Sequence, residues 1–188
     1  MMAIQKLFKA FVLAALMTCL KCQKKIPGST ENTDITRFYD KNGIIWTLET
    51  TEPTTIRCKF DVVNKSTHHG VRLMRQYYWI GSRTNVYLDG TFMSKPVLKN
   101  TYNAMRITEK ESVFKSIEQL LFAYQDYACG IFKVTLLHPD QMDYLELRLK
   151  ESILSEPKRR CIEKFVELSK GAKITPIYSS ACRTKRKL

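Results

Sequence analysis

Apolar and polar residues alternate along much of the chain, and this period-two pattern is typical of antiparallel strands with one buried face. The clearest example is the segment 56–62, where apolar and charged positions take turns. One face carries Ile56, Cys58, Phe60 and Val62, and the other carries Arg57, Lys59 and Asp61. Comparable runs, separated by turn-forming residues, predict further strands at 44–48, 71–79, 85–92, 99–107, 129–137 and 144–149.

The segment 112–127 fits two structures. Its apolar residues recur at helical spacing between Val113 and Leu121, while 120–124 also fits a strand. Because the neighbouring segments alternate, we favour a strand from about residue 117. About eight short strands are therefore expected in total.

Short helices are predicted on both sides of this series of strands. The apolar residues of 35–39 are spaced for one helical turn, with Thr33 or Asp34 as its N-cap. Near the other end, an amphipathic helix follows Pro157 and stops at Gly171. A last strand then leads to the final cysteine.

Many short strands with closely spaced turns indicate either a β-sandwich or a β-barrel. An immunoglobulin-type sandwich places a tryptophan between two paired cysteines. Here Trp46 precedes Cys58, and Trp79 lies far from Cys129. We therefore predict an all-β fold, an eight-stranded antiparallel barrel, which is a shape that can enclose a small ligand.

Residues 1–22 have the features of a signal peptide. A basic start is followed by the apolar run 11–17, which is too short to span a bilayer. We expect Cys19 and Cys22 to be removed with this leader. The alternative, a lipoprotein signal ending at Cys19, places Thr18 where a smaller residue is usual. The protein is thus predicted to be secreted and extracellular.

Four cysteines remain after the leader, an even number that favours two disulfides in an oxidising compartment. They are Cys58, Cys129, Cys161 and Cys182, and their spacings of 71, 32 and 21 residues match no metal-ligand pattern. We expect no metal site. Asn64 begins an Asn-Lys-Ser triplet and is a candidate N-glycosylation site in a predicted surface loop.

The rest of the chain fits one domain, 23–182, followed by a basic tail, 183–188. Without the leader it carries 28 Lys and Arg residues against 18 Asp and Glu residues. This excess favours acidic partners, such as heparin-like sugars, anionic lipid or an anionic ligand, and it is equally explained by a solvated surface that keeps the protein soluble. Secretion argues against nucleic acid. We find no hydrolase, zinc-protease or phosphate-loop motif, so neither an enzyme nor a cofactor is expected.

The chain resembles the salivary lipocalins of ticks, which include the histamine-binding proteins. The similarity covers nearly the whole mature chain and is carried by 45–53 before Cys58, 127–131, 145–147 and the block 161–182. The resemblance implies the lipocalin barrel and the disulfides Cys58–Cys182 and Cys129–Cys161. It also implies a monomer that captures a small host mediator, histamine or serotonin in some members and a fatty acid or leukotriene in others, and so blunts host defence.

Amine binding needs an inward carboxylate, because an ammonium ion loses its water on entry. The family pattern has an Asp where this chain has Gly130, a carboxylate where it has Thr91, and an aromatic residue where it has Arg148. Only Glu146 matches. The alternation in 144–150 alone would place Glu146 in solvent, whereas the family orientation places it and Arg148 inside. The predicted ligand-binding residues are Trp46, Tyr77, Tyr87, Asp89, Phe122, Tyr124, Phe132, Glu146 and Arg148.

Three ligands therefore remain open from the sequence. The family favours a biogenic amine. A guanidinium beside Glu146 neutralises the charge that an amine needs and suits an anionic lipid mediator instead. The net positive charge suits a host protein or polyanion bound on the outer surface.

Overall fold

The computed structural model describes residues 29–30, 33–40, 42–96, 101–109, 113–137, 142–155 and 159–186. The predicted leader, Cys19, Cys22, Pro157 and the last two residues of the basic tail lie outside these ranges.

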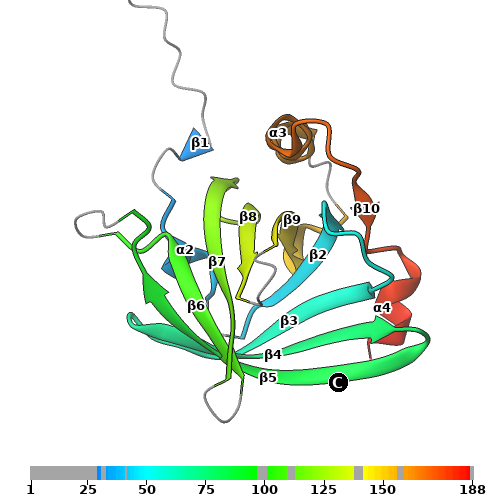
Figure 1. Ribbon diagram of the computed structural model, residues 1–188, viewed down its shortest axis with the longest axis horizontal. Coiled ribbons are helices and arrows are strands. Elements are labelled where there is room, and N and C mark those ends of the chain that lie inside the picture. The colour runs from blue at the N-terminus through cyan, green and yellow to red at the C-terminus, as the bar shows by residue number, and fades with distance from the viewer. Residues whose placement is uncertain are drawn as a thin grey trace, which may run out of the picture.

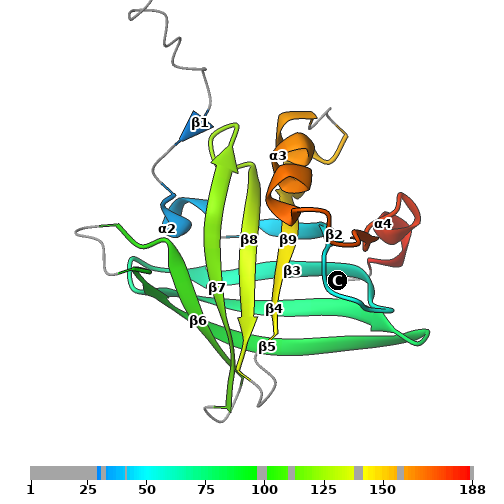
Figure 2. The same ribbon diagram turned by 45° about the horizontal axis from the view of Figure 1, so that its top comes forward.

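Eight antiparallel strands form a closed barrel (Figures 1 and 2), as predicted. From β2 to β9, each strand pairs with the next along the chain. The first of these strands, β2, also pairs with the last, β9, and this pairing closes the barrel. The strands are β2 (Ile44–Thr50), β3 (Arg57–Ser66), β4 (Gly70–Trp79), β5 (Ser82–Met93), β6 (Ala104–Glu109), β7 (Val113–Tyr124), β8 (Cys129–Leu136) and β9 (Asp143–Lys150). Two short strands, β1 (Ser29–Thr30) and β10 (Thr175–Pro176), pair with β7 and β2.

The element boundaries refine two predictions. The segment 112–127, which fitted either a helix or a strand, forms strand β7. This strand begins at Val113, four residues before the expected start. The sequence predicted a loop at Asn64, but strand β3 continues through Ser66. Asn64 is therefore exposed near the end of a strand. Its glycosylation stays a prediction.

A short helix, α2 (Ile35–Phe38), closes one end of the barrel. Of the two predicted caps, Thr33 and Asp34, it is Asp34 that caps the helix, because its Oδ1 accepts a hydrogen bond from the Thr36 amide at 3.0 Å. The Ile35 amide donates to the Tyr102 carbonyl at 2.8 Å, in the connection between β5 and β6. We call this the helix end. The opposite end, where β2, β4, β6 and β8 finish and β3, β5, β7 and β9 begin, is the loop end.

The interior near the helix end is apolar. Ile35 and Phe38 from α2 are fully buried and belong to one apolar cluster with side chains from β2 through β8. The Phe38 and Phe132 rings meet edge to face, with 4.9 Å between their centroids. The other buried members of this cluster include Leu73, Leu88, Phe92, Met105, Ile107 and Leu120.

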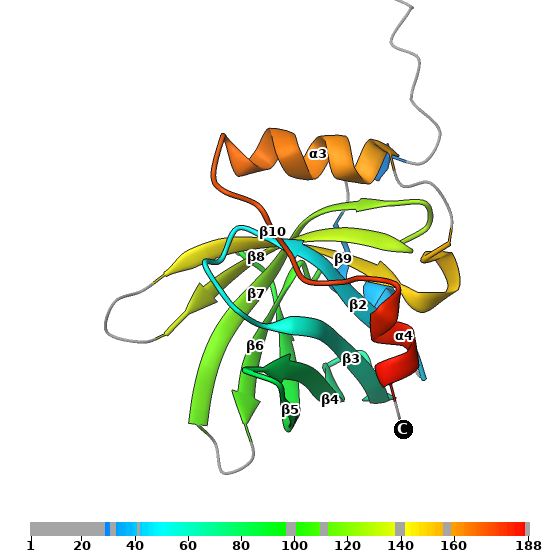
Figure 3. The same ribbon diagram turned by 90° about the vertical axis from the view of Figure 1, so that its right-hand side faces the viewer.

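The helix α3 (Arg159–Ser169) lies outside the barrel, across β8 and β9 (Figure 3). It buries Phe165 against the outward side chains of Leu147 and Leu149. The disulfide Cys129–Cys161 joins this helix to β8, as the resemblance implied. None of the helices among the described residues is long and apolar enough to cross a membrane.

The second disulfide, Cys58–Cys182, joins the start of β3 to a last helix, α4 (Ala181–Lys185), which the sequence did not predict. This pairing is also the one that the resemblance implied. Beside it, Trp46 packs against Phe60 and Tyr178, with ring centroids 4.6 and 5.1 Å away. The C-terminal segment thereby covers an apolar patch on the outer face of β2 and β3.

Candidate functional site

Six charged side chains meet in the middle of the barrel, between the apolar cluster and the loop end. We call them the ionic layer, and its members are Lys59 and Asp61 on β3, Arg75 on β4, Glu118 on β7, and Glu146 and Arg148 on β9. None has a side chain more than 12% exposed. Such groups persist inside a protein only when each charge has a partner.

One half of the layer is centred on Glu146. Lys59 Nζ donates to its Oε1 at 2.5 Å, and Arg148 Nε donates to its Oε2 at 2.7 Å. Arg148 then reaches across the barrel, and its Nη1 donates to Glu118 Oε2. A single guanidinium therefore bridges the carboxylates of two separate strands.

The other half is centred on Arg75. Its Nη1 donates to Glu118 Oε1 at 2.8 Å. Its Nε and Nη2 donate to the two carboxylate oxygens of Asp61 at 2.7 and 2.8 Å, which is the bidentate geometry of strong pairs. Cations and carboxylates thus alternate from Lys59 to Asp61, and the three positive charges balance the three negative ones.

Two aromatic residues complete the surroundings of Arg148. Its Nη1 donates to the Tyr39 hydroxyl at 2.7 Å, and its Cζ lies 4.5 Å from the centroid of the Phe132 ring. We call Glu118, Glu146, Tyr39 and Phe132 the guanidinium cage. They come from β7, β9, the residue after α2, and β8, so four distant segments converge on one cation.

The carboxylates of the cage are ionised at neutral pH. Burial alone would raise the pKa of Glu146, but the nearby Arg148 and Lys59 outweigh burial and lower that pKa to about 2. Burial would likewise raise the pKa of Glu118, but Arg148 and Arg75 hold it well below its usual range. Burial raises the pKa of the Tyr39 hydroxyl, which stays protonated.

Three of the predicted ligand-binding residues lie in this layer or beside it: Phe132, Glu146 and Arg148. Tyr77 follows Arg75 by two positions in β4 and so falls on the same inner face, toward the loop end. The interpretation that placed Glu146 in solvent is wrong. It failed because α3 covers the apolar side of β9, which leaves the polar side facing inward.

Five other predicted residues lie outside the interior. Tyr87 is exposed, and Asp89 pairs on the outer surface with Arg72 at 2.8 Å. Trp46 lies beneath the C-terminal segment. Phe122 and Tyr124 belong to the cluster beneath α3, because a register shift between Leu120 and Phe122 turns them outward.

Sequence reasoning missed Tyr39, Lys59, Asp61, Arg75 and Glu118 as members of the site. A signal for two of them was present, because Lys59 and Asp61 share the charged face of 56–62. That face points inward, since the apolar face is covered by the C-terminal segment. Nothing local in the sequence indicates that Glu118 and Tyr39 meet Arg148.

Gly130 faces the apolar cluster and has no room for a side chain. A Cβ at this position would lie 2.6 Å from a Phe38 ring carbon and 2.9 Å from a Phe132 ring carbon. The aspartate that the family pattern has at this position would therefore collide with the side chains that pack here.

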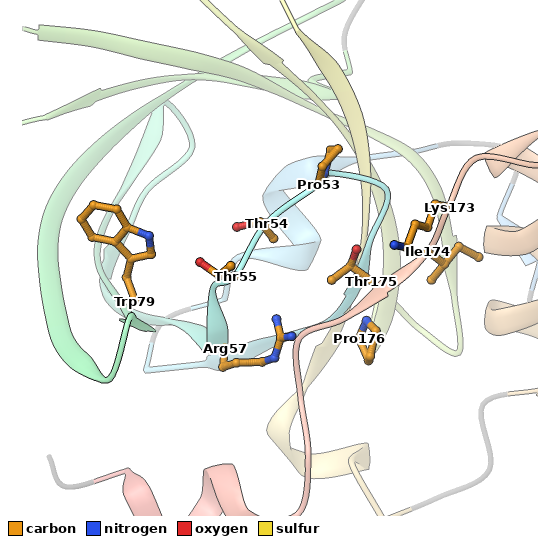
Figure 4. A pocket seen from close by; sticks show the side chains of 9 residues that line it. All are labelled: Pro53, Thr54, Thr55, Arg57, Trp79, Lys173, Ile174, Thr175 and Pro176. Atoms are coloured by element: carbon orange, nitrogen blue, oxygen red, sulfur yellow. The ribbon is translucent and has the colours of Figure 1, made fainter.

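A depression of about 660 Å³ opens at the loop end. Figure 4 shows the β2–β3 loop crossing it between the Trp79 ring and the side chains of Lys173 and Ile174. We call it the loop-end depression, and its lining is Pro53, Thr54, Thr55, Arg57, Trp79, Lys173, Ile174, Thr175 and Pro176. Arg57, Lys173 and Trp79 are exposed, so two cations and an indole are available to a ligand.

Within the described residues, no group of His, Cys, Asp and Glu side chains is arranged to hold a metal ion. The carboxylates of the ionic layer are instead held by lysine and arginine.

Comparison with known proteins gives one family and a set of similar folds. The family model for tick histamine binding protein matches residues 46–184. None of the curated protein sequences matches the chain in a direct comparison. Among solved structures, AM182 in its serotonin complex is 17% identical, with a TM-score of 0.59 over 81% of this chain and 94% of that one.

Two further structures share the fold. The siderocalin Ex-FABP is 8% identical, with a TM-score of 0.56 over 74% of this chain and 94% of that one. Apocrustacyanin C2 is 10% identical, with a TM-score of 0.56 over 86% of this chain and 97% of that one. At these identities the likeness concerns the lipocalin-like barrel alone.

Proposed function

Because the chain belongs to the tick histamine-binding protein family, whose model matches residues 46–184, we propose that it is a secreted, monomeric lipocalin that sequesters a small host mediator without catalysis. Both the family match and the lipocalin-like fold support a barrel that binds a ligand. We further propose that its ligand is a small anionic amphiphile, such as a fatty acid or leukotriene, and not a biogenic amine.

The choice of an anionic ligand over an amine rests on the pairing of the interior carboxylates. Asp61, Glu118 and Glu146 are each already held by an arginine or lysine of the chain itself. An amine that enters must give up its water, and only an unpaired carboxylate compensates for that loss. To bind there, an amine has to displace a guanidinium or ammonium group that is already in contact.

The loop-end depression supports an anion instead. Arg57 and Lys173 offer positive charge, and Trp79 offers an apolar face that is 55% exposed. An amphiphile with a carboxylate head fits this combination, because arginine binds carboxylates and the indole packs against hydrocarbon. Burial raises the pKa of the Glu52 carboxyl, which lies next in sequence to Pro53 of the depression.

Isothermal titration with leukotriene B4, oleate, histamine and serotonin tests the proposal. We expect a lipid to bind and both amines to bind more weakly than ~1 µM. The double variant Arg57→Ala, Lys173→Ala is expected to lower lipid affinity roughly tenfold, because each exposed charged contact contributes up to about 1 kcal/mol and about 1.4 kcal/mol corresponds to a factor of ten. Arg72→Ala, an exposed arginine outside the depression, is the matched control.

Two results would contradict the proposal. Histamine binding tighter than ~1 µM would show that an amine does displace the chain's own cations. Equal lipid affinity in the double variant and in the wild type would remove the loop-end depression as the site.

A further inference from the structure

We infer that the guanidinium cage is a cation-binding site filled by the chain's own Arg148, and that this residue excludes amines from the barrel. A vacated cage would take a small guanidinium or primary ammonium ion. The inference concerns the interior and stands whether or not a ligand binds at the loop end.

The cage contains the groups that recognise an organic cation. Glu118 and Glu146 supply negative charge, the Tyr39 hydroxyl accepts a hydrogen bond, and the Phe132 ring presents a face. All four residues are fully buried or nearly so. Such a set is costly to assemble without a cation, because two carboxylates in a dry interior repel one another.

The charges of the ionic layer show what Arg148 neutralises. With Arg148 the layer has three cations and three carboxylates. Without it, Lys59 still contacts Glu146 and Arg75 still contacts Asp61 and Glu118, so one negative charge has no counter-ion. That single excess charge lies between Glu118 and Glu146, where the guanidinium now lies.

The attachment of Arg148 to β9 explains why free amines do not compete. A tethered group acts at an effective concentration on the order of millimolar or higher, without the entropic cost of association. A free amine in the micromolar range therefore cannot replace it. Arg148 is in this sense a specificity-determining residue, since it decides which charge the interior accepts.

The test removes Arg148 and supplies its missing atoms in solution. Arg148→Ala keeps the Cβ, and ethylguanidinium supplies counterparts of the two missing side-chain carbons and of the guanidinium. We expect millimolar ethylguanidinium to raise the thermal midpoint of this variant by several degrees and to leave that of the wild type unchanged. We also expect histamine to give a binding isotherm with the variant alone.

A double variant provides the matched control. In Arg148→Ala, Glu118→Gln the layer again has equal numbers of cations and carboxylates, so the excess negative charge is gone. This protein is expected to fold and to show no response to ethylguanidinium. A response equal to that of the single variant would show that the compound fills space and is not bound as a cation, which would overturn the inference.

The single variant gives an answer even if it does not fold unaided. The readout is then the yield of refolded, disulfide-bonded protein with and without ethylguanidinium. A yield that rises with the compound supports the inference. A folded variant that binds neither ethylguanidinium nor histamine more tightly than the wild type, or a refolding yield that the compound does not change, overturns it.

Discussion

Arg72 and Arg75 stand three residues apart in β4, and each contacts a carboxylate, yet they face opposite sides of the barrel wall. Arg72 pairs with Asp89 on the outer surface, where both side chains are more than half exposed. Arg75 pairs with Asp61 and Glu118 inside, where its side chain is 12% exposed. Both are arginine–carboxylate pairs, but only the Arg72 pair is exposed to water. Burial therefore decides what each arginine contributes to stability.

The energetic contrast follows from hydration. An exposed pair contributes about 0–1 kcal/mol, because water and salt screen both charges. A buried pair adds little net stability over an apolar pair, but removing one partner leaves a charge without water or counter-ion. The interior arginines are therefore needed mainly because the interior carboxylates are present.

The largest expected effect comes from Arg75→Met. This change leaves Asp61 buried without a partner and Glu118 with only Arg148, so we expect a loss of about 3–5 kcal/mol in the free energy of unfolding. Urea unfolding with the disulfides intact measures it. An unfolding midpoint equal to that of the wild type would mean that water reaches the layer and that the contrast with Arg72 is not one of burial.

An intermediate loss of stability is expected when the pH is lowered. The pKa of Glu146 is about 2 in the folded protein and 4.5 ordinarily, so between these values the unfolded chain binds more protons. The stability that Glu146 contributes is present above pH 4.5 and is lost as the pH falls toward 2. The shift corresponds to roughly 3 kcal/mol.

Unfolding of the wild type and of Glu146→Gln between neutral pH and pH 2 tests this window. We expect the variant to be less stable at neutral pH and the two curves to converge as the pH falls. Asp89→Asn, on the exposed outer face, is the control and is expected to follow the wild type. Parallel curves for Glu146→Gln and the wild type would contradict the assignment.

The smallest effect is expected from Arg72→Ala. Loss of the exposed pair with Asp89 should lower stability only slightly at low salt and by less at high salt, because solvent and ions screen both charges. Urea unfolding at two ionic strengths measures both values. A loss comparable to that of Arg75→Met would erase the distinction between the two faces.

The sequence predicted the elements of the fold better than the direction in which they face. Strand periods, the Asp34 cap and the barrel all follow from local patterns, and the disulfide pairs follow from the family resemblance. Period two separates two faces of a strand but does not say which one is inside. In β3 and β9 the apolar face is outside, because the C-terminal segment and α3 cover it.

The interior site depends on contacts that no local pattern contains. Arg148 meets Tyr39, which is 109 residues away, and Glu118, which is 30 residues away. The aromatic candidates Trp46, Phe122 and Tyr124 failed as interior residues for a related reason. They pack under elements that join the barrel only through the tertiary fold, so their hydrophobicity alone could not place them.

The disulfide Cys58–Cys182 has a consequence for resistance to proteolysis. It spans 124 residues, from the start of β3 to α4. A cut in any exposed loop between these cysteines leaves both pieces covalently joined, and the closed sheet holds them in place. A single cut is then expected to release no fragment until the disulfide is reduced, so a nicked barrel would remain one particle.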